Sequence, residues 1–547
     1  MKPTLREATV GWIADDVDDN ARAELRTILV AAIAGDPAAA DELADRMAGP
    51  LVFGTAGLRG PVRAGPNGMN RAVVVRTTAG VSSWLAAGGH RGGVVVVGRD
   101  ARRGSAEFAA DAASVLDAAG FQVRVLDRPL PTPVLAFAVR HLNAVAGIQI
   151  TASHNPATDN GYKLYDGSGA QIIPPADAEI EAAIAQAPAA ASVPRSPGWT
   201  TICDEILEPY LQRVTELPRG TARELKIVLT PLCGVGGAVA TEALRRAGFT
   251  DIHVVTEQFT PDPSFGGLTF PNPEEHGACD RLLELASAAQ ADLAIAFDPD
   301  ADRCALGIPS GDGYRMLWGD ETGALLGEHV LSSMDRAEPL VATTIVSSSM
   351  LASIARAHTA HYAETLTGFK WLVRASDGST DLVFAYEEAL GLCVDPQTVR
   401  DKDGITAAVL AADLAAARKA NGSSLQEMLD ELAAAHGVHL TDQLSIRVGE
   451  LDHITELMTR LRAHPPTELT GTPVDLDDLL PHADVLRFTG DGIRAIVRPS
   501  GTEPKLKVYL QIVRPVDAAT SLDPTTATAQ TALDALRDEV RSLLTRR

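Results

Sequence analysis

Residues 293–303 read Leu293-Ala294-Ile295-Ala296-Phe297-Asp298-Pro299-Asp300-Ala301-Asp302-Arg303. The apolar run at the start is typical of a strand that is buried on both faces of a sheet. Three aspartates follow at alternate positions, so their carboxylates stand at the carboxyl end of the strand, where α/β proteins bind ligands. Carboxylates this close repel one another unless a cation joins them, and hard divalent cations prefer oxygen ligands. The stretch therefore predicts an α/β domain with a metal site at the end of a strand.

Strand–helix–strand units recur along the chain and predict α/β domains with mixed or parallel sheets. The first two units share an Ala-Gly-Phe phrase after the helix, which alone is weak evidence because helices often end at glycine. The expected strand, helix and strand cover 93–97, 105–119 and 121–126 in the first unit, 226–229, 238–247 and 252–255 in the second, and 341–346, 350–358 and 361–366 in the third.

The two ends of the chain show other patterns. Ala, Leu and charged residues at helical spacing predict helix over about 15–48, and the first strand after it is expected at Ala72–Arg76. The carboxyl end predicts a separate, smaller α+β domain. Its expected elements are strands at 495–498 and 505–512 and a helix at 528–544.

Composition limits the class of protein. At roughly 150 residues per domain, the 547 residues predict three or four domains. The net charge of −23 argues against a nucleic-acid partner, whose phosphates need clustered cations, so an anionic substrate must be bound locally by a few arginines and backbone amides. The five cysteines show no metal-type spacing, and no apolar run approaches about 18 residues. A cytoplasmic protein with free thiols is expected.

A second polar loop reads Thr151-Ala152-Ser153-His154-Asn155-Pro156. Ser153 is a candidate hydroxyl for carrying a transferable group, although these residue types are also common in turns. No Gly-x-Ser-x-Gly elbow surrounds the serine, which argues against a hydrolase triad. Lys163 is either a proton-transfer group, if neighbouring cations lower its pKa, or a surface lysine. The two loops together predict a metal held against a phosphorylated serine, and hence phosphoryl transfer.

The acidic loop fits two other classes of site less well. In a helix–loop–helix calcium site the sixth and twelfth positions are Gly and Glu, whereas Arg303 and Pro309 stand there. In an aspartyl-phosphate hydrolase, Asp298 would be the nucleophile and Asp300 the acid/base. That alternative leaves Ser153 without a task and is the weaker account.

Four further segments combine flexible backbone with polar or charged side chains. Arg498–Lys505 offers an arginine fork, hydroxyls and a glycine, and is either a phosphate cradle or an ordinary turn between strands. Phe53–Gly60 pairs glycines with Arg59. Tyr386–Gly391 has carboxylates that can bind sugar hydroxyls, although a helix start rich in Glu is the common explanation. Cys233–Gly237 lacks the full spacing of a dinucleotide loop and is interpreted as structural.

Taken together, in their order along the chain, these loops resemble the α-D-phosphohexomutase family, which contains phosphoglucomutases and phosphomannomutases. Gly54–Gly60, Thr367–Lys370 and Glu387–Ala389 are similar to the branch that also includes phosphopentomutases and glucose 1,6-bisphosphate synthases. The resemblance covers the chain from about Phe53 to its end. It implies an α/β fold in which three similar α/β domains with mixed sheets and a smaller C-terminal α+β domain surround a central cleft.

The resemblance also implies a division of the chain. The expected segments are a helical extension (1–50), domain 1 with the phosphoserine loop (51–205), domain 2 with the metal-binding loop (206–318), domain 3 with the sugar-binding loop (319–445) and domain 4 with the phosphate-binding loop (446–547). Linkers are expected near 187–198 and 465–473, which are rich in Pro and small or polar residues.

By resemblance, each motif residue has a role. Ser153 carries the phosphoryl group, and the three aspartates hold Mg²⁺ against that phosphate. Lys163 and Arg59 match positions for proton transfer or charge stabilisation. The residues that match metal ligands are Asp298, Asp300 and Asp302, with Ser153 through its phosphate, and those that match substrate contacts are Arg303, Thr367, Gly368, Glu387, Lys402, Arg498, Ser500, Gly501 and Thr502.

These roles imply an isomerase that interconverts hexose 1-phosphate and hexose 6-phosphate, of glucose, mannose or both, through a phosphoserine and a bisphosphate. The expected cofactors are Mg²⁺ and a hexose 1,6-bisphosphate as activator or primer. The expected partner is a small sugar phosphate, without nucleic acid or membrane, and the protein is expected to be a monomer or a small homo-oligomer.

Three positions depart from the family pattern. Ala389 stands where many relatives have a serine that binds a sugar hydroxyl, which keeps a phosphopentomutase or a glucose 1,6-bisphosphate synthase open as alternatives. Phe369 stands where some bacterial relatives have a histidine, and Cys233 replaces a common histidine. An inactive phosphosugar-binding regulator would lack the serine, an aspartate or the arginine loop, and all three are present.

Overall fold

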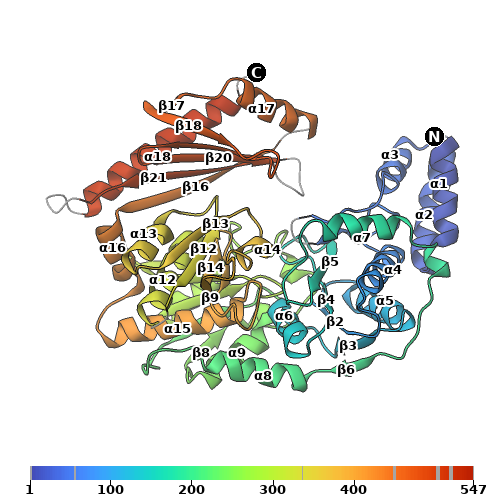
Figure 1. Ribbon diagram of the computed structural model, residues 1–547, viewed down its shortest axis with the longest axis horizontal. Coiled ribbons are helices and arrows are strands. Elements are labelled where there is room, and N and C mark those ends of the chain that lie inside the picture. The colour runs from blue at the N-terminus through green and yellow to red at the C-terminus, as the bar shows by residue number, and fades with distance from the viewer. Residues whose placement is uncertain are drawn as a thin grey trace. The chain divides into compact units, whose positions relative to one another are not determined.

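A computed structural model describes residues 3–54, 57–334, 337–447, 451–499, 505–516 and 522–545. The chain forms two compact units, and each is described by itself; Figure 1 labels their elements. The first unit contains Met1–Leu317, Phe369–Arg374 and Ala389–Ala420, and the second contains Trp318–Gly368, Ala375–Glu388 and Asn421–Arg547.

The first unit contains a six-stranded mixed sheet. Its strands are β1 (Leu58–Pro61), β2 (Val94–Arg99), β3 (Gln122–Leu126), β4 (Ala146–Ile150), β5 (Asp159–Asp166) and β6 (Thr200–Ile202), and the helices of this region are α4 (Arg71–Ala87), α5 (Ser105–Ala118), α6 (Thr132–His141), α7 (Ala176–Ala185) and α8 (Asp204–Thr215). The strand order is β1-β5-β4-β2-β3-β6. β2 runs parallel to β3 and β4, whereas β5 is antiparallel to β1 and β4. α5 packs on β2 and β3, so the first predicted strand–helix–strand unit is confirmed.

The strand predicted at Ala72–Arg76 is wrong, because these residues form the start of α4. Asn70 caps this helix, and its side chain accepts a hydrogen bond from the Val73 amide. Val74 and Val75, which favoured a strand locally, are fully buried on the helix. Tertiary packing of a long apolar helix outweighs the β-propensity of a short valine run. The first strand of the sheet is instead β1.

A second, five-stranded mixed sheet carries the acidic loop. Its elements are β7 (Ile227–Thr230), β8 (Ile252–Val254), β9 (Leu293–Phe297), β10 (Cys304–Ser310), β11 (Gly313–Met316), α9 (Gly236–Arg246), α10 (Thr256–Phe259) and α11 (Asp280–Ala289). The order is β11-β10-β9-β7-β8, with β7 parallel to β8 and β9. Every residue of β9 is buried, as its apolar run predicted. The first unit also contains α14 (Phe369–Leu372), β15 (Gly391–Cys393) and α15 (Gly404–Ala420), which packs on β9 and β10.

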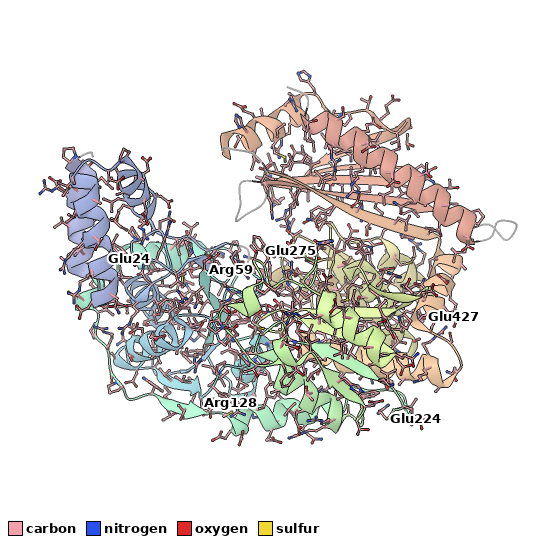
Figure 2. All side chains as sticks on the ribbon, turned by 180° about the vertical axis from the view of Figure 1, so that it is seen from behind. Glu24, Arg59, Arg128, Glu224, Glu275 and Glu427 are labelled. Atoms are coloured by element: carbon pink, nitrogen blue, oxygen red, sulfur yellow. The ribbon has the colours of Figure 1, made fainter. Side chains whose placement is uncertain are left out.

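Three helices precede the first sheet: α1 (Pro3–Asp15), α2 (Asp19–Ile33) and α3 (Pro37–Arg46). The segment predicted as helical, 15–48, thus contains two helices, and a third precedes it. Asp18 and Asp36 begin α2 and α3, since their carboxylates accept hydrogen bonds from backbone amides of the first turn. Arg46 on α3 donates to Glu24 on α2 at 2.6 Å (Glu24 is labelled in Figure 2). This ion pair joins two of the helices of the extension.

The second unit begins with a parallel α/β arrangement. Its elements are β12 (Pro339–Thr344), β13 (His361–Thr365), β14 (Asp381–Glu387), α12 (Gly319–Ser332), α13 (Met350–Ala357) and α16 (Leu425–His436). β12 runs parallel to both β13 and β14, which confirms the third predicted strand–helix–strand unit. Tyr386 and Glu387 end β14, so the alternative of a helix start at Tyr386–Gly391 is wrong.

A six-stranded antiparallel sheet follows in the second unit. Its elements are β16 (Val438–Arg447), β17 (Glu468–Leu469), β18 (Thr472–Asp478), β19 (Leu486–Gly490), β20 (Ile493–Pro499), β21 (Lys505–Arg514), α17 (Leu451–Ala463) and α18 (Leu522–Thr545). The order is β16-β21-β20-β19-β18-β17, and α18 packs along β16 and β21 (Figure 1). This confirms the C-terminal α+β arrangement. The linker predicted near 465–473 is wrong, because β17 and β18 pair as a hairpin there.

The other predicted linker, 187–198, contains a single short 3-10 helix, Ala190–Ser192, and no further helix or strand. Within the part of the chain that the structure describes, every helix is too short or too polar to cross a lipid bilayer.

Candidate active site

Ser153 lies in the loop between β4 and β5, two strands that pair antiparallel. Its backbone has a φ of 53°, in the left-handed region, and its amide donates to Thr151 Oγ1 at 2.9 Å. The residue is only 2% exposed. Its Oγ donates to Asp298 Oδ2 at 2.7 Å and lies 3.1 Å from His154 Nδ1. The two loops singled out in the sequence therefore meet at the serine hydroxyl.

The three aspartates after β9 face one another. Asp298, Asp300 and Asp302 are buried, and each offers one carboxylate oxygen within 4.8 Å of the other two. Asp298 Oδ1 accepts from the Arg303 amide at 3.1 Å. The Oδ1 atoms of Asp300 and Asp302 are buried and have no hydrogen-bond partner among the residues that the structure describes. Burying a carboxylate oxygen without a partner costs free energy, which a bound cation can offset. Because all the atoms that could ligate a metal here are oxygens, this set fits a hard divalent cation such as Mg²⁺.

Lys163 lies between two of these carboxylates. It is buried on β5, and its Nζ donates to Asp300 Oδ2 and to Asp302 Oδ2, at 2.7 Å each. Lys402 Nζ lies 3.2 Å from the same oxygen of Asp302, and Thr132 Oγ1 donates to Asp300 Oδ2 at 2.5 Å. The surface-lysine alternative for Lys163 is therefore wrong. Burial lowers the pKa of Lys163, but the charges of Asp300 and Asp302 outweigh it and hold the pKa above its usual value, so the expected lowering by neighbouring cations is wrong for this structure. Thr132, at the start of α6, is a site residue that the sequence did not identify.

Burial and charge act on the aspartates in opposite directions. Burial, reinforced by the charges of Asp300 and Asp302, raises the pKa of Asp298 well above its usual range. Burial also opposes ionisation of Asp302, but Lys163 and Lys402 outweigh it and hold the pKa of Asp302 far below its usual range. A divalent cation bound at these oxygens favours the ionised form of all three carboxylates.

Two arginines bring positive charge to the serine loop. Arg59, on β1 and labelled in Figure 2, donates from Nη1 to Asn155 Oδ1 at 3.1 Å. Arg303 directly follows the last aspartate of the acidic loop. Burial, followed by the charges of Arg303 and Arg59, lowers the pKa of His154 well below its usual value. The imidazole beside Ser153 is therefore neutral at pH 7.

Arg102 is a second site residue that the sequence did not identify. Its guanidinium is buried and donates to backbone carbonyls of the serine loop, from Nη1 to Pro156 at 2.7 Å and to Asp159 at 3.0 Å, and from Nη2 to Ser153 and Asn155. The guanidinium of Arg102 thus stabilises the turn in which Ser153 has its left-handed backbone conformation.

The surroundings of Arg102 explain how it can be buried. Its Nε lies 3.3 Å from Asp100 Oδ2, and its guanidinium carbon lies 4.8 Å from the ring centroid of Phe265, which belongs to the region of the second sheet. Cation–π contact and the ion pair offset part of the cost of removing the charge from water. The available signal was an Asp-x-Arg sequence directly after the buried strand β2.

Arg102→Lys is expected to destabilise the protein by about 2–4 kcal/mol and to lower kcat, because one ammonium with three N–H donors cannot satisfy the four carbonyls that Arg102 binds. Urea unfolding measures the first effect and steady-state turnover of the substrate measures the second. Arg103→Lys is the matched control, since Arg103 is the exposed neighbour. Equal stability of the two variants would contradict this role of Arg102.

The remaining predicted contacts are distributed as follows. Lys402 Nζ lies 5.4 Å from the ring centroid of Phe369, in the first unit.

The structural interpretation of Cys233–Gly237 agrees with the packing at Gly234. The backbone there lies so close to the acidic loop that a Cβ would be 2.4 Å from Pro299 Cα. Thr367, Gly368, Glu387 and Arg498 belong to the second unit, and Ser500, Gly501 and Thr502, with Thr55 and Ala56, lie outside the described residues.

The chain matches one protein family along most of its length. Four domain descriptions of the phosphoglucomutase/phosphomannomutase family match in order: alpha/beta/alpha domain I over residues 50–190, domain II over 208–311, domain III over 318–436 and the C-terminal domain over 447–529. The fold class inferred from the sequence is confirmed. The domain boundaries predicted there stay predictions.

Individual relatives agree with these matches. The chain is 40% identical over 456 residues to a Haemophilus influenzae protein named "Probable phosphomannomutase", covering 81% of this chain and 93% of the relative. It is 33% identical over 503 residues to a Staphylococcus aureus phosphoglucomutase, covering 85% and 90%. A phosphoglucomutase/phosphomannomutase family protein from Burkholderia thailandensis shares the fold, with a TM-score of 0.69, 22% identity and coverage of 90% and 96%. The sequence resemblance is thereby confirmed, and the chain belongs to the phosphoglucomutase/phosphomannomutase family.

Proposed function

We propose that this protein is a phosphohexomutase that interconverts hexose 1-phosphate and hexose 6-phosphate, with glucose, mannose or both as the sugar. The observation that carries the proposal is the 2.7 Å hydrogen bond from Ser153 Oγ to Asp298, within a centre that also contains Lys163. Family membership and the names of the relatives support hexose substrates over the pentose and bisphosphate-synthase alternatives.

The proposed reaction transfers two phosphoryl groups in turn, one from Ser153 to the sugar and the other from the sugar to Ser153. In the first, a free hydroxyl oxygen of the sugar phosphate attacks the phosphorus on phosphorylated Ser153; the Oγ–P bond breaks, a sugar O–P bond forms and the hydroxyl loses its proton. In the second, Ser153 Oγ attacks the other phosphoryl group of the bisphosphate, the bond to that sugar oxygen breaks, and the oxygen gains a proton. Neither water nor a nucleotide is consumed.

The proposed site residues have different roles in this reaction. Asp298, Asp300 and Asp302 would hold Mg²⁺ with an oxygen of the phosphoryl group on Ser153. When bound, the cation neutralises charge that develops on the transferred phosphoryl group. Lys163 and Arg59 are proposed to move the proton or stabilise charge; the further proposed substrate contacts are Arg303, Lys402, Thr367, Gly368 and Glu387 and, for the phosphate that is not transferred, Arg498, Ser500, Gly501 and Thr502.

A substrate panel tests the proposal. The 1-phosphates of glucose, mannose, glucosamine and ribose are each supplied with Mg²⁺, with and without a hexose 1,6-bisphosphate. We expect kcat/KM for glucose 1-phosphate or mannose 1-phosphate to exceed that for ribose 1-phosphate by about tenfold or more, since one lost set of hydroxyl contacts costs roughly 1.4 kcal/mol or more. The bisphosphate is expected to increase the rate by restoring phosphorylated Ser153. Preference for ribose, or release of inorganic phosphate in place of isomerisation, would contradict the proposal.

A further inference from the structure

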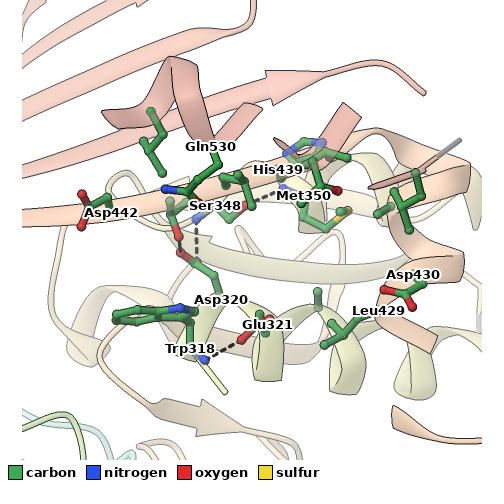
Figure 3. Close-up of a pocket in the computed structure, with 18 of the residues that line it drawn as sticks. Trp318, Asp320, Glu321, Ser348, Met350, Leu429, Asp430, His439, Asp442 and Gln530 are labelled. Atoms are coloured by element: carbon green, nitrogen blue, oxygen red, sulfur yellow. Dashed lines mark hydrogen bonds between the residues drawn. The ribbon is translucent and has the colours of Figure 1, made fainter. Parts of the chain in front are cut away.

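Asp320 is a carboxylate that joins three segments of the second unit. It lies in the first turn of α12. Its Oδ1 accepts hydrogen bonds from the Ser348 amide at 2.7 Å and from the Tyr386 hydroxyl at 3.0 Å, and its Oδ2 accepts from Thr441 Oγ1 at 2.9 Å. The three donors belong to the loop after β12, to the end of β14 and to β16, and Figure 3 shows Asp320 and Ser348 side by side. One side chain therefore links segments that are far apart in the sequence.

On one side, Asp320 reaches the end of β14 next to Glu387. The ring of Tyr386 is fully buried against α12, where a Cβ at Gly323 would lie 2.5 Å from it. On the other side of Glu387, the carboxylate of Glu388 accepts from Ser347 Oγ at 3.1 Å. Glu387, the proposed sugar contact, thus stands between two anchored residues.

On the other side, Asp320 reaches the C-terminal sheet. Thr441 on β16 pairs with Gln511 on β21, and the Gln511 amide donates to Ser348 Oγ at 3.1 Å and to Ser349 Oγ at 3.0 Å. β21 in turn pairs with β20, which carries Arg498. The loop after β12, which is hydrogen-bonded to Asp320, is therefore also hydrogen-bonded to the C-terminal sheet that contains Arg498.

A cavity of about 520 Å³ lies beside Asp320. It lies between α12 and α16 on one side and β16 and α18 on the other, and Figure 3 shows the residues that line it. Its apolar lining comes from both sides, for example Met350 and Leu429 from one and Leu440 and Leu533 from the other. An apolar cluster that includes Val346 and Tyr509 also joins the loop after β12 to the C-terminal sheet. Beside the cavity, Asp320 reaches that sheet through its hydrogen bond from Thr441.

We infer that Asp320 is a positioning residue of the mutase, which sets the place of Glu387 relative to the sheet that carries Arg498. The inference rests on the proposed function, in which Glu387 binds sugar hydroxyls and Arg498 binds the phosphate that is not transferred. A substrate held at both ends is sensitive to the spacing of its two contacts, since a displacement of about 1 Å can cost on the order of 100-fold in rate. Asp320 acts on the substrate through Tyr386 and Thr441.

Two variants of the full-length protein test this role. Thr441→Val and Tyr386→Phe each remove one hydroxyl from Asp320 with little change of shape. We expect each to raise KM for the preferred hexose phosphate by about fivefold, the equivalent of one hydrogen bond. Because both act through one carboxylate, the double variant should raise KM by less than the product of the single effects. Asp320→Asn, which keeps one oxygen acceptor, should show a smaller rise than the double variant.

Thr322→Val is the matched control, because Thr322 Oγ1 is buried on the same helix and has no hydrogen-bond partner in the described part of the chain. The KM of this variant should equal that of the wild type. Loss of folded protein lowers the apparent kcat and leaves KM unchanged, so KM separates positioning from a purely structural role. An active wild type whose KM is unchanged in both hydroxyl variants overturns the inference and leaves the proposed function intact. A wild type that turns over no hexose phosphate overturns the proposed function.

Discussion

Ser153→Ala is expected to abolish mutase turnover, lowering kcat by about 10³-fold or more. The alanine has no oxygen to receive a phosphoryl group, while the aspartates and Lys163 keep their other contacts. Formation of hexose 6-phosphate from the 1-phosphate, with bisphosphate present, measures the loss. Intact-mass analysis gives a second readout: freshly isolated wild type should show partial single phosphorylation, and this species should be absent in the variant.

Ser83→Ala is the control for this substitution. Ser83 is exposed on α4, and its Oγ donates only to the Ala79 carbonyl among the contacts that the structure describes for it, so wild-type turnover is expected. If Ser153→Ala kept activity and released inorganic phosphate, the enzyme would instead be an aspartyl-phosphate hydrolase with Asp298 as the nucleophile. Ser153 would then be an ordinary hydrogen-bond partner of Asp298.

Short sequence patterns predicted correctly those strands in which every residue is apolar and buried. The apolar run Leu293–Phe297 is buried at every position and became β9 with the predicted bounds. Ala72–Arg76 was read wrongly because a valine run of that length suits a buried strand or a buried helix, and the capping by Asn70 is the local sign of the helix. The hairpin at 465–473 was missed because its prolines and threonines resemble a linker, whereas pairing with more distant strands decides its structure.

Within the site, the sequence predicted the groups that do chemistry and missed those that hold them. Ser153, Lys163 and the aspartates stand in short motifs with a recognisable type of side chain. Arg102 was missed because the groups that it binds are backbone carbonyls, which every residue has. Thr132 was missed because its partner, Asp300, is 168 residues away, and only the packing of the two sheets brings them together.

Asp300→Asn is expected to raise the Mg²⁺ concentration for half-maximal activity by about 100-fold and to lower kcat by a similar factor, since a lost anionic ligand costs a few kcal/mol of cation binding. The amide can keep its oxygen toward Lys163 and Thr132, and its NH₂ then replaces Oδ1 of Asp300, which has no hydrogen-bond partner within the described segments. The folded structure should therefore survive while the cation loses a ligand.

The measurement is a Mg²⁺ titration of activity together with thermal unfolding. Mg²⁺ that binds only the folded state raises Tm in proportion to RT ln(1 + [Mg²⁺]/Kd), so wild type should gain stability at Mg²⁺ concentrations that leave Asp300→Asn unchanged. A chelator should reverse both the activity and the Tm gain in the wild type. Asp280→Asn, an exposed aspartate in the first turn of α11, serves as the control for the lost charge. Should Asp300→Asn keep the wild-type Mg²⁺ dependence in both assays, the acidic loop would not be the metal site, and the cation would have to act elsewhere or not at all.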